Sequence, residues 1–396
     1  MTTTIQAESA LESGAATTSA PKAPVNIDDS FQVPWNVHCL SGLVSRIPGL
    51  WKFLGNLESN SFQDQLPKHV ERPVFISGIA RSGSTILLEV LAAHRDVGTH
   101  QYRDFPMLYT PVWWSQATEK QTRRSLPVER AHGDGILVTP ESPEAMEEVL
   151  WMGFFPDAHN SQRSQILDQD TSNPPFEQFY GDHVRKLLYV RKRTRYVSKG
   201  NYNFSRLAYL QKIFPDARFV VPVRHPVQHI ASLMKQHRLF TEGEERYPRA
   251  LAHMQRVGHF EFGLDRRPIH IGNPDTIHRI LDLWNSGEEV RGWACYWNAL
   301  YEWVWKQLQE NDTLRAATQV IRYEDLCDAP HRRLAQLLTH CELPEDKNVA
   351  AFADRIQAPS YYKPRFSERE LEVIAEETAP ASRLFGYGRG NRPAAE

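Results

Sequence analysis

The 396-residue sequence lacks features that define whole classes of protein. No stretch approaches the ~18 consecutive apolar residues that a membrane-spanning helix needs, which disfavours an integral membrane protein. The 46 basic and 48 acidic residues leave a net charge of -2, whereas nucleic-acid-binding domains are usually strongly basic. We therefore expect no membrane span and no nucleic-acid partner, and any anion-binding site must be local.

Cysteine is also scarce, and its spacing matches neither a CxxC pair nor a zinc site. The four cysteines are Cys39, Cys295, Cys327 and Cys341. Because they do not form a disulfide framework, we predict reduced thiols and a cytoplasmic protein.

The chain divides into segments of different composition. Residues 1–30 are rich in Ala, Thr and Ser and lack both a signal-peptide pattern and an Arg-rich transit pattern, so we predict a disordered tail. We assign residues 31–71 to an N-terminal extension, residues 72–388 to one main domain and residues 389–396 to a C-terminal tail. Within the domain, residues 241–289 are polar and show no clear strand, which predicts an insertion over the ligand site.

Short apolar runs alternate with helical patterns in the main domain, which predicts an α/β fold with parallel strands. The candidate strands are residues 73–77, 97–101, 195–199, 217–224 and 318–323. Helices are expected after residue 84, from Ser142 with its serine cap and following proline, and near residues 332–340. Trp293, Trp297, Leu300, Val304 and Leu308 have helical spacing and predict a buried helix face.

The first run leads into the sequence Gly78-Ile79-Ala80-Arg81-Ser82-Gly83-Ser84-Thr85, which has the GxxxxG spacing of a P-loop. Main-chain N–H groups of such a loop and of the following helix start favour a phosphate-like anion. Ser84 stands where a nucleotide hydrolase has lysine, and the cation is instead Arg81 inside the loop. Hydrolysis of ATP or GTP is therefore the less favoured use of this loop.

A second motif follows the strand predicted over residues 217–224. Arg224 lies at the carboxyl end of this strand, where open α/β sheets bind ligands. Pro226 suits the first turn of a helix, and Ser232 then lies about two turns along. An arginine fork and a serine hydroxyl can together hold a phosphate. The alternative for Arg224 is a surface salt bridge at a helix start.

With GIARSGST after a strand and VRHPVQHIAS downstream, the chain resembles the sulfotransferases that use 3'-phosphoadenosine 5'-phosphosulfate (PAPS). The first loop is most similar to the RSG[ST]T form of tyrosylprotein, carbohydrate and many bacterial sulfotransferases. The resemblance continues through YVSKGN, FPDARFVVPVRHP and IRYEDL, so it covers roughly residues 72–388. It implies a P-loop-type three-layer fold, with a central parallel sheet flanked by helices.

The resemblance implies that PAPS is the co-substrate and assigns residues to it. The 5'-phosphosulfate would bind Arg81, Ser82, Gly83, Ser84 and Thr85. The 3'-phosphate would bind Arg224 and Ser232. The family's glycine-rich 3'-phosphate loop has no clear counterpart near the C-terminus unless residues 361–365 supply it. We expect Arg81 to stabilise charge during transfer and Lys199 to reach the same group; the alternative for Lys199 is a surface cation.

No metal is expected. His225 and His229 have helical i, i+4 spacing but lack supporting ligands, so we interpret them as solvated or capping residues.

The general base is expected just beyond the first helix, in residues 97–106, which lack the glutamate of the tyrosylprotein enzymes. We predict Asp104 first and His100 second, since either group can take a proton near neutral pH. Asp104 can alternatively pair with Arg103 or cap a turn, and His100 can be a packed strand residue. Glu147 and Glu148, like Glu141, are weaker candidates because an amphipathic helix carries acids on its wet face.

The acceptor is not identified by the sequence. We expect a hydroxyl (or amine) of a carbohydrate or small metabolite, because such acceptors are common in the family. Four arginines of the polar segment would allow an anionic substrate: Arg246, Arg249, Arg266 and Arg267. The alternatives are a P-loop kinase-like phosphotransferase and a non-catalytic nucleotide-binding protein.

Overall fold

The computed structural model describes residues 30–118, 127–129, 137–357 and 365–388. Its centre is a five-stranded sheet in the order β2-β5-β1-β6-β7, with every neighbouring pair parallel. The strands are β1 Val74–Ser77, β2 Val97–Gly98, β5 Arg195–Gly200, β6 Arg218–Val223 and β7 Thr318–Arg322. A separate antiparallel pair consists of β3 Val128–Glu129 and β4 Leu137–Val138. The predicted strands are confirmed, although the strand expected over 97–101 ends at Gly98.

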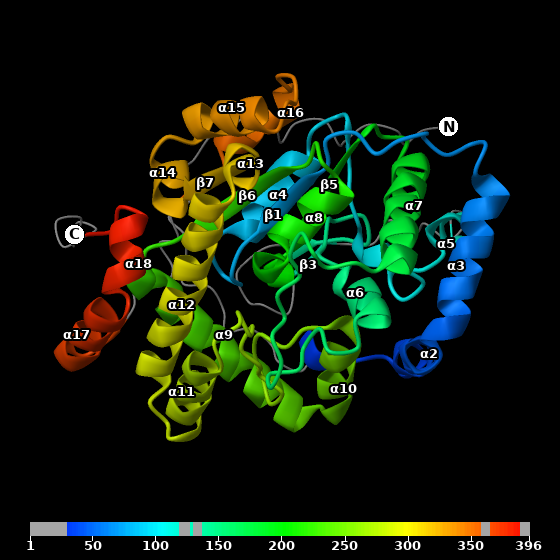
Figure 1. Cartoon of the computed structure of the whole chain (residues 1–396). Coiled ribbons are helices and arrows are strands. Elements are labelled where there is room, and N and C mark those ends of the chain that lie inside the picture. Colours follow the sequence, from blue (N-terminus) through cyan, green and yellow to red (C-terminus); the bar gives the residue numbers. More distant parts are fainter. Residues whose placement is uncertain (1–29, 119–126, 130–136, 358–364, 389–396) are drawn as a thin grey trace, which may run out of the picture.

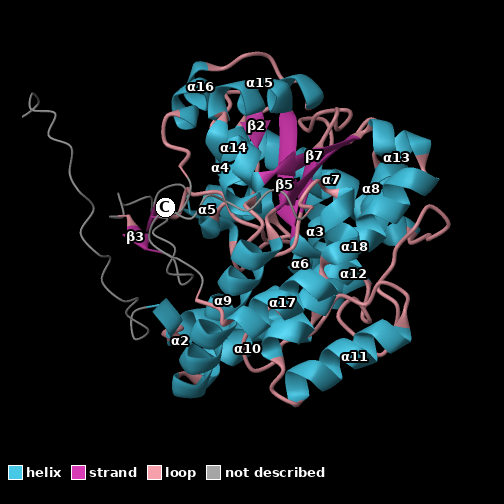
Figure 2. Ribbon diagram, turned by 90° about the vertical axis from the view of Figure 1, so that its left-hand side faces the viewer, coloured by secondary structure: helices cyan, strands magenta, loops and turns pink. Residues whose placement is uncertain are grey.

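Helices cover both faces of the sheet (Figures 1 and 2). In the first half they are α2 Trp35–Arg46, α3 Pro48–Phe62, α4 Ser84–Ala92, α5 Pro111–Thr118, α6 Glu148–Phe154, α7 Pro174–Arg191 and α8 Leu207–Ile213. They continue with α9 Pro226–Arg246, α10 Pro248–Val257, α11 Pro274–Asn285, α12 Glu289–Glu310, α13 Asp312–Ala316 and α14 Tyr323–Asp328. The last are α15 Pro330–His340, α16 Lys347–Ala353, α17 Glu368–Glu377 and α18 Ala379–Leu384, and short 3-10 turns span Tyr102–Asp104 and Asn201–Ser205.

Alternation along the strands divides the interior into two cores. In β1, Val74 and Ile76 pack with α4 and α15, whereas Phe75 faces the larger core formed by α7, α8, α9 and α12. Successive strand side chains point to opposite faces, so one short run serves both layers. Both views place α15 and α16 on one side of the sheet and α9 and α12 on the other. This arrangement confirms the three-layer α/β fold.

The helix expected over residues 293–308, with one face buried, is confirmed. Trp293, Trp297, Leu300, Val304 and Leu308 are all buried in α12.

The prediction that a helix begins at Ser142 is wrong, because α6 begins only at Glu148. The preceding residues instead run beside the 3-10 turn Tyr102–Asp104: Tyr102 N–H donates to the Ser142 carbonyl, and Gln101 forms a bridge with Pro143. Pairing with this distant segment overrides the local capping signal.

Candidate active site

The loop after β1 has the backbone geometry that its two glycines permit. Gly83 adopts φ +100°, and a Cβ there would lie 2.6 Å from the Tyr323 ring. At Gly78 a Cβ would lie 2.7 Å from the Pro222 ring. Helix α4 begins directly after Gly83 with no side-chain cap, so its first N–H groups face the loop without a capping acceptor from a side chain.

The loop and the second motif, far apart in sequence, are in contact. Arg81 Nε donates to Ser232 Oγ at 3.2 Å, and Arg224 Nη1 donates to the Arg81 carbonyl at 3.2 Å. The Arg224 guanidinium also lies 5.0 Å from the centre of the Tyr323 ring. Because β1, β6 and β7 are parallel, the residues that follow them meet at one edge of the sheet. The structure thus brings Arg81, Arg224 and Ser232 together.

Helix α9 supports the loop through the buried side chain of His229. Trp297 Nε1 donates to His229 Nδ1 at 3.1 Å, so Nε2 carries the proton that His229 donates to the Ala80 carbonyl at 2.8 Å. Burial is the main reason that its pKa is lowered to about 3, and the nearby Arg224 and Arg81 lower it further. The expectation of a solvated or capping residue is wrong for His229. His225 occupies the N-cap position of α9, but its side chain makes no capping hydrogen bond there.

A cavity of about 550 Å³ opens from the loop. At one end its wall contains Ala80, Arg81, Thr85 and Lys199, and we call this the donor end. The other end, which we call the acceptor end, is lined by residues 30–34 and by parts of α6 and α10 with the loop that follows α10. Its apolar lining includes Phe31, Val33, Phe105, Met146, Trp151, Phe240, Met254, Val257 and Phe262.

Two glutamates of this wall are held by buried partners. The Glu147 carboxylate accepts hydrogen bonds from Tyr180 at 2.6 Å, from Tyr196 at 2.5 Å and from Ser198. It is 4% exposed, so the expectation that it lies on the wet face of a helix is wrong. The three hydroxyls come from two elements, α7 and β5, which pack against the start of α6.

Glu148 is part of a buried ion cluster. Both of its carboxylate oxygens accept from Arg206 at 2.8 Å, and His159 Nε2 lies 2.7 Å from one of them. Burial alone would raise the pKa of Glu148, but the charges of Arg206 and His159 hold it at about 2. This cluster fixes the acceptor-end wall, so Glu148 also lies away from the predicted solvated face.

A third carboxylate of the wall connects α10 to the donor end. Asn201 Nδ2 donates to Glu261 Oε1 at 2.6 Å, and Asn201 follows Lys199 by two residues at the end of β5. His259 Nδ1 lies 3.5 Å from Glu261 Oε2, and its ring stacks on Phe240 with centroids 4.9 Å apart. The cavity is lined by all five of these residues: Lys199, Asn201, Phe240, His259 and Glu261. The sequence analysis did not identify His259 or Glu261, whose HxE spacing within a polar segment carries no specific signal.

Asp104 and His100 lie beneath the cavity wall and do not contribute to its lining. Asp104 accepts from Arg191 Nη2 at 2.5 and 2.6 Å and from the Gln101 N–H at 2.8 Å. Burial opposes ionisation, but His100 and Arg191 lower the pKa of the Asp104 carboxyl overall. His100 Nε2 lies 3.1 Å from His183 Nε2, and both rings are buried. The ion pair of Asp104 therefore forms with Arg191 on α7, not with the neighbouring Arg103.

The polar segment does not present its arginines to the cavity. Arg249 lies over the Trp35 ring, Arg246 is 3.6 Å from Glu242, and Arg267 pairs with Asp265. Arg266 makes two 2.8 Å bonds to Glu289 and packs on Trp284. None of the four lines the cavity, so the expectation that they admit an anionic acceptor is wrong.

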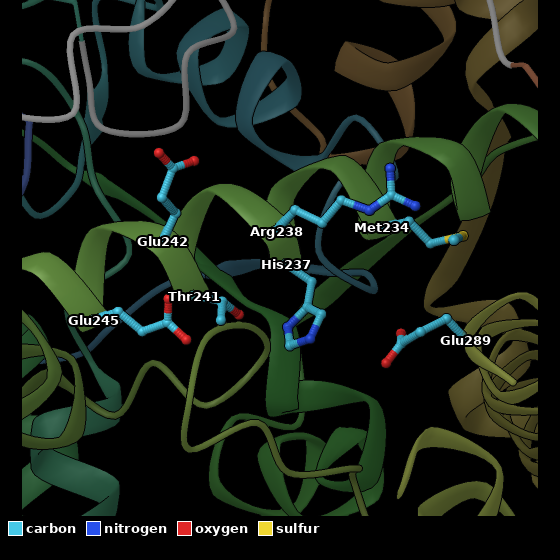
Figure 3. A pocket seen from close by; sticks show the side chains of 7 residues that line it. All are labelled: Met234, His237, Arg238, Thr241, Glu242, Glu245 and Glu289. Atoms are coloured by element: carbon cyan, nitrogen blue, oxygen red, sulfur yellow. The ribbon is translucent and has the colours of Figure 1, made fainter. Parts of the chain in front are cut away.

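A separate hollow of about 350 Å³ lies along α9 and includes the carboxylate that binds Arg266. Figure 3 shows Glu289 reaching toward it from α12, with His237 on the α9 side. Burial lowers the pKa of His237 to about 4. No residue of the 78–85 loop lines this hollow, so it is distinct from the donor end.

Three further expectations concern absent or undescribed features. Among the described residues, no three His, Cys, Asp or Glu side chains gather where they could hold a metal ion. No helix in the described ranges is long and apolar enough to cross a membrane. The proposed C-terminal phosphate contact at 361–365 falls mostly outside the described residues, which resume at Arg365.

Structural comparison places the chain near bacterial sulfotransferases. STF1 of Mycobacterium tuberculosis is 15% identical with a TM-score of 0.45, over 89% of this chain and 94% of that one. STF9 of Mycobacterium avium is 14% identical with a TM-score of 0.47, over 85% and 83%. A sulfotransferase of Alicyclobacillus acidocaldarius is 13% identical with a TM-score of 0.38, over 80% and 97%. At these low scores the likenesses do not identify a substrate.

Sequence comparison is more decisive. A search of curated proteins finds no significant match. Residues 73–266, however, match the family model described as "Sulfotransferase family". This region contains β1, the glycine loop and β5, which supply the donor end, and β6 and α9, which supply Arg224 and Ser232 beside the loop. Over residues 73–266 the chain is therefore similar to the sulfotransferase family.

Proposed function

We propose that the protein transfers a sulfuryl group from PAPS to a hydroxyl (or amine) of an acceptor that binds in the 550 Å³ cavity. The observation that carries the proposal is the contact between the two predicted anion-binding motifs at Arg81, which lines this cavity. Arg81 bonds to Ser232, and Arg224 bonds to the Arg81 main chain, so a donor with two anionic groups would meet both motifs at one sheet edge.

The residues present fit such a donor. Ser82 Oγ is fully buried within the loop and has no hydrogen-bond partner among the described residues, which suits an anion oxygen arriving there. The uncapped start of α4 would hold the 5'-phosphosulfate, with the hydroxyls of Ser84 and Thr85. Arg224 and Ser232 would hold the 3'-phosphate. Since Ser84 replaces the lysine of nucleotide hydrolases, ATP lacks its usual cationic partner.

Bound PAPS supplies a sulfuryl group on a good leaving phosphate, and the chain supplies position and charge. Arg81 and Lys199 line the same end of the cavity, from the loop after β1 and from the end of β5. By analogy with phosphoryl transfer, two cations there stabilise negative charge on the transferring group and on the leaving phosphate. We expect loss of either cation to lower kcat more than acceptor binding.

For the general base we propose His259, oriented by Glu261. A base must reach the acceptor proton from the cavity, and the His259–Glu261 pair lies on its wall, whereas Asp104 is bound to Arg191 outside it. Asn201 ties Glu261 to the end of β5, so the pair is held next to the strand that carries Lys199. The imidazole would take the acceptor proton, and the carboxylate would stabilise the imidazolium that forms.

Calorimetric titration with adenosine 3',5'-bisphosphate tests the donor assignment. We expect binding to the wild type that is weakened by Arg81→Ala and by Arg224→Ala and not matched by ATP with magnesium. Arg315→Ala, in an exposed pair with Asp312, is the matched control and should bind normally. Binding of magnesium-ATP without bisphosphate binding would overturn the proposal and favour a kinase-like phosphotransferase.

Turnover of labelled PAPS with a panel of acceptors separates the base candidates. We expect His259→Ala to lower kcat by about 10²–10⁴-fold with unchanged bisphosphate affinity, as is usual for a general base. Glu261→Gln should have a smaller effect in the same direction. Full turnover by His259→Ala would eliminate this residue and return the assignment to Asp104 or His100.

A further inference from the structure

The N-terminal helices α2 and α3 expose an unusual amount of apolar surface. Ten large apolar side chains are exposed in the described part of the chain, and six of them fall between residues 35 and 57. These are Trp35, Leu43, Ile47, Leu50, Phe53 and Leu57. Trp35 is 67% exposed and Phe53 is 63% exposed. Clustered exposed apolar groups of this kind mark interaction sites, whereas single ones need no explanation.

The six side chains follow the helix repeat. In α2, Trp35 and Leu43 lie on one stripe, which ends in Arg46, while Val44 packs inward. In α3, Leu50, Phe53 and Leu57 are spaced by three and four residues and so share a face. Residues Gly55, Glu58 and Ser59 form the buried side of α3. We call the two exposed stripes, together with Ile47 between them, the N-terminal apolar face.

The exposed charged side chains within α2, α3 and α10 are basic. The exposed charged residues of α2 and α10 include Arg46 and Arg249, whereas Lys52 of α3 turns away from the face and its Nζ donates to the Gly153 carbonyl at 3.1 Å. The only acidic residue in these three fully described helices is Glu58, which is buried and lies 3.0 Å from Lys186. An apolar face on helices that carry exposed basic but no exposed acidic side chains complements an anionic, partly apolar partner.

The face is also continuous with the acceptor end of the cavity. Helix α2 lies against α10, where the Arg249 guanidinium covers the Trp35 ring at 5.5 Å and Arg256 donates to the His38 carbonyl at 2.7 Å. Val37 of α2 and Val257 of α10 line the cavity itself. In Figure 1, α3 stands at the outer edge of the molecule, with α2 between its lower end and α10. A surface bound to this face would therefore adjoin the acceptor end.

We propose that the N-terminal apolar face docks the protein peripherally on an anionic lipid bilayer. Tryptophan, phenylalanine and leucine beside arginine and lysine are the composition of helices that lie in the membrane interface. Trp35 would sit at headgroup depth, Leu50, Phe53 and Leu57 would enter the acyl boundary, and Arg46 and Arg249 would meet lipid phosphates. Docking in this way needs no spanning helix.

Sedimentation of the full-length protein with vesicles tests the proposal. The vesicles are phosphatidylcholine alone or phosphatidylcholine with about 30% phosphatidylglycerol, since anionic lipid attracts cations near the surface. We expect binding to the anionic vesicles that weakens with salt, and little binding to the neutral ones. Leu50→Glu/Phe53→Glu should reduce the vesicle partition coefficient at least about tenfold, because acids replace apolar groups at the interface.

Leu371→Glu, at a 40% exposed leucine of α17, is the matched control and should bind as the wild type does. Circular dichroism and bisphosphate titration confirm that each variant is folded. Binding that is equal for the double variant and the wild type would overturn the proposal. So would absence of vesicle binding together with a dimer in light scattering that the double variant dissociates, because the face would then join two copies of this chain.

Discussion

The two ends of the cavity are built in different ways. The donor end is formed by short segments that directly follow parallel strands, with Arg81 after β1 and Lys199 at the end of β5. The acceptor end combines residues 30–34 with α6, α10 and the loop after α10, which are distant in sequence. A neutral buried histidine supports the donor loop, whereas an ion cluster around Glu148 supports the acceptor wall. Local backbone geometry therefore defines one end, and long-range packing defines the other.

The largest expected effect is that of Gly83→Ala. The added Cβ would clash with the Tyr323 ring, and the backbone at this position has a positive φ that residues with a Cβ rarely adopt. The loop must therefore move. We expect bisphosphate affinity to fall at least about 100-fold, in the range seen when an oriented oxyanion donor is removed. Calorimetry measures the loss. Gly181→Ala in α7 has open space for its Cβ and should bind normally; equal binding by both variants would show that the donor end tolerates loop movement.

Glu148→Gln tests the ion cluster of the acceptor wall. Breaking a buried pair leaves Arg206 without its carboxylate, and we expect a loss of about 3 kcal/mol in the free energy of unfolding at pH 7. In the wild type this contribution is full above the unfolded pKa of 4.5 and is lost as the pH falls toward the folded value of about 2. Urea unfolding at several pH values measures it. Glu376→Gln, at an exposed position of α17, should change stability little, and a similar loss there would contradict the assignment.

His229 makes the free energy of unfolding depend on pH over a higher range than Glu148 does. Its folded pKa of about 3 lies below the ordinary 6.5, so the unfolded chain binds the proton more tightly between these values. The contribution of neutral His229 to the free energy of unfolding is full above pH 6.5. It falls as the pH decreases and is smaller by about 2 kcal/mol at pH 5. We expect His229→Phe to be less stable at pH 7 and to show a flatter pH profile. An unchanged slope between pH 5 and 6.5 would show that His229 is not buried in its neutral form.

The smallest expected effect concerns substrate selection at the acceptor end. Met254→Arg places a cation in the apolar lining, and we expect kcat/KM for the acceptor to fall at least about tenfold. Bisphosphate affinity should not change, because the loop lies at the other end. Met254→Leu keeps the apolar volume and is the control. If Met254→Arg also weakened bisphosphate binding, the two ends of the cavity would be coupled. Ends built from different segments would then not function independently.

The sequence by itself determined the order of elements and the donor end. Gly83 needs a positive φ, Pro226 suits a helix start, and alternating apolar strands require helices on both faces, all of which are short-range backbone properties. These constraints brought Arg81, Arg224 and Ser232 to one sheet edge, because parallel strands share their carboxyl ends.

Only the tertiary structure decided which polar groups face the cavity. Glu147 carried a helical surface signal, yet hydroxyls of Tyr180 and Tyr196 bury it, and the start of α6 is displaced by pairing near Gln101. His259 and Glu261 reach the wall because α10 ends beside β5 through Asn201. Such contacts join residues 33 to 60 positions apart, and their energies depend on burial and partner geometry, which no local pattern of residues encodes.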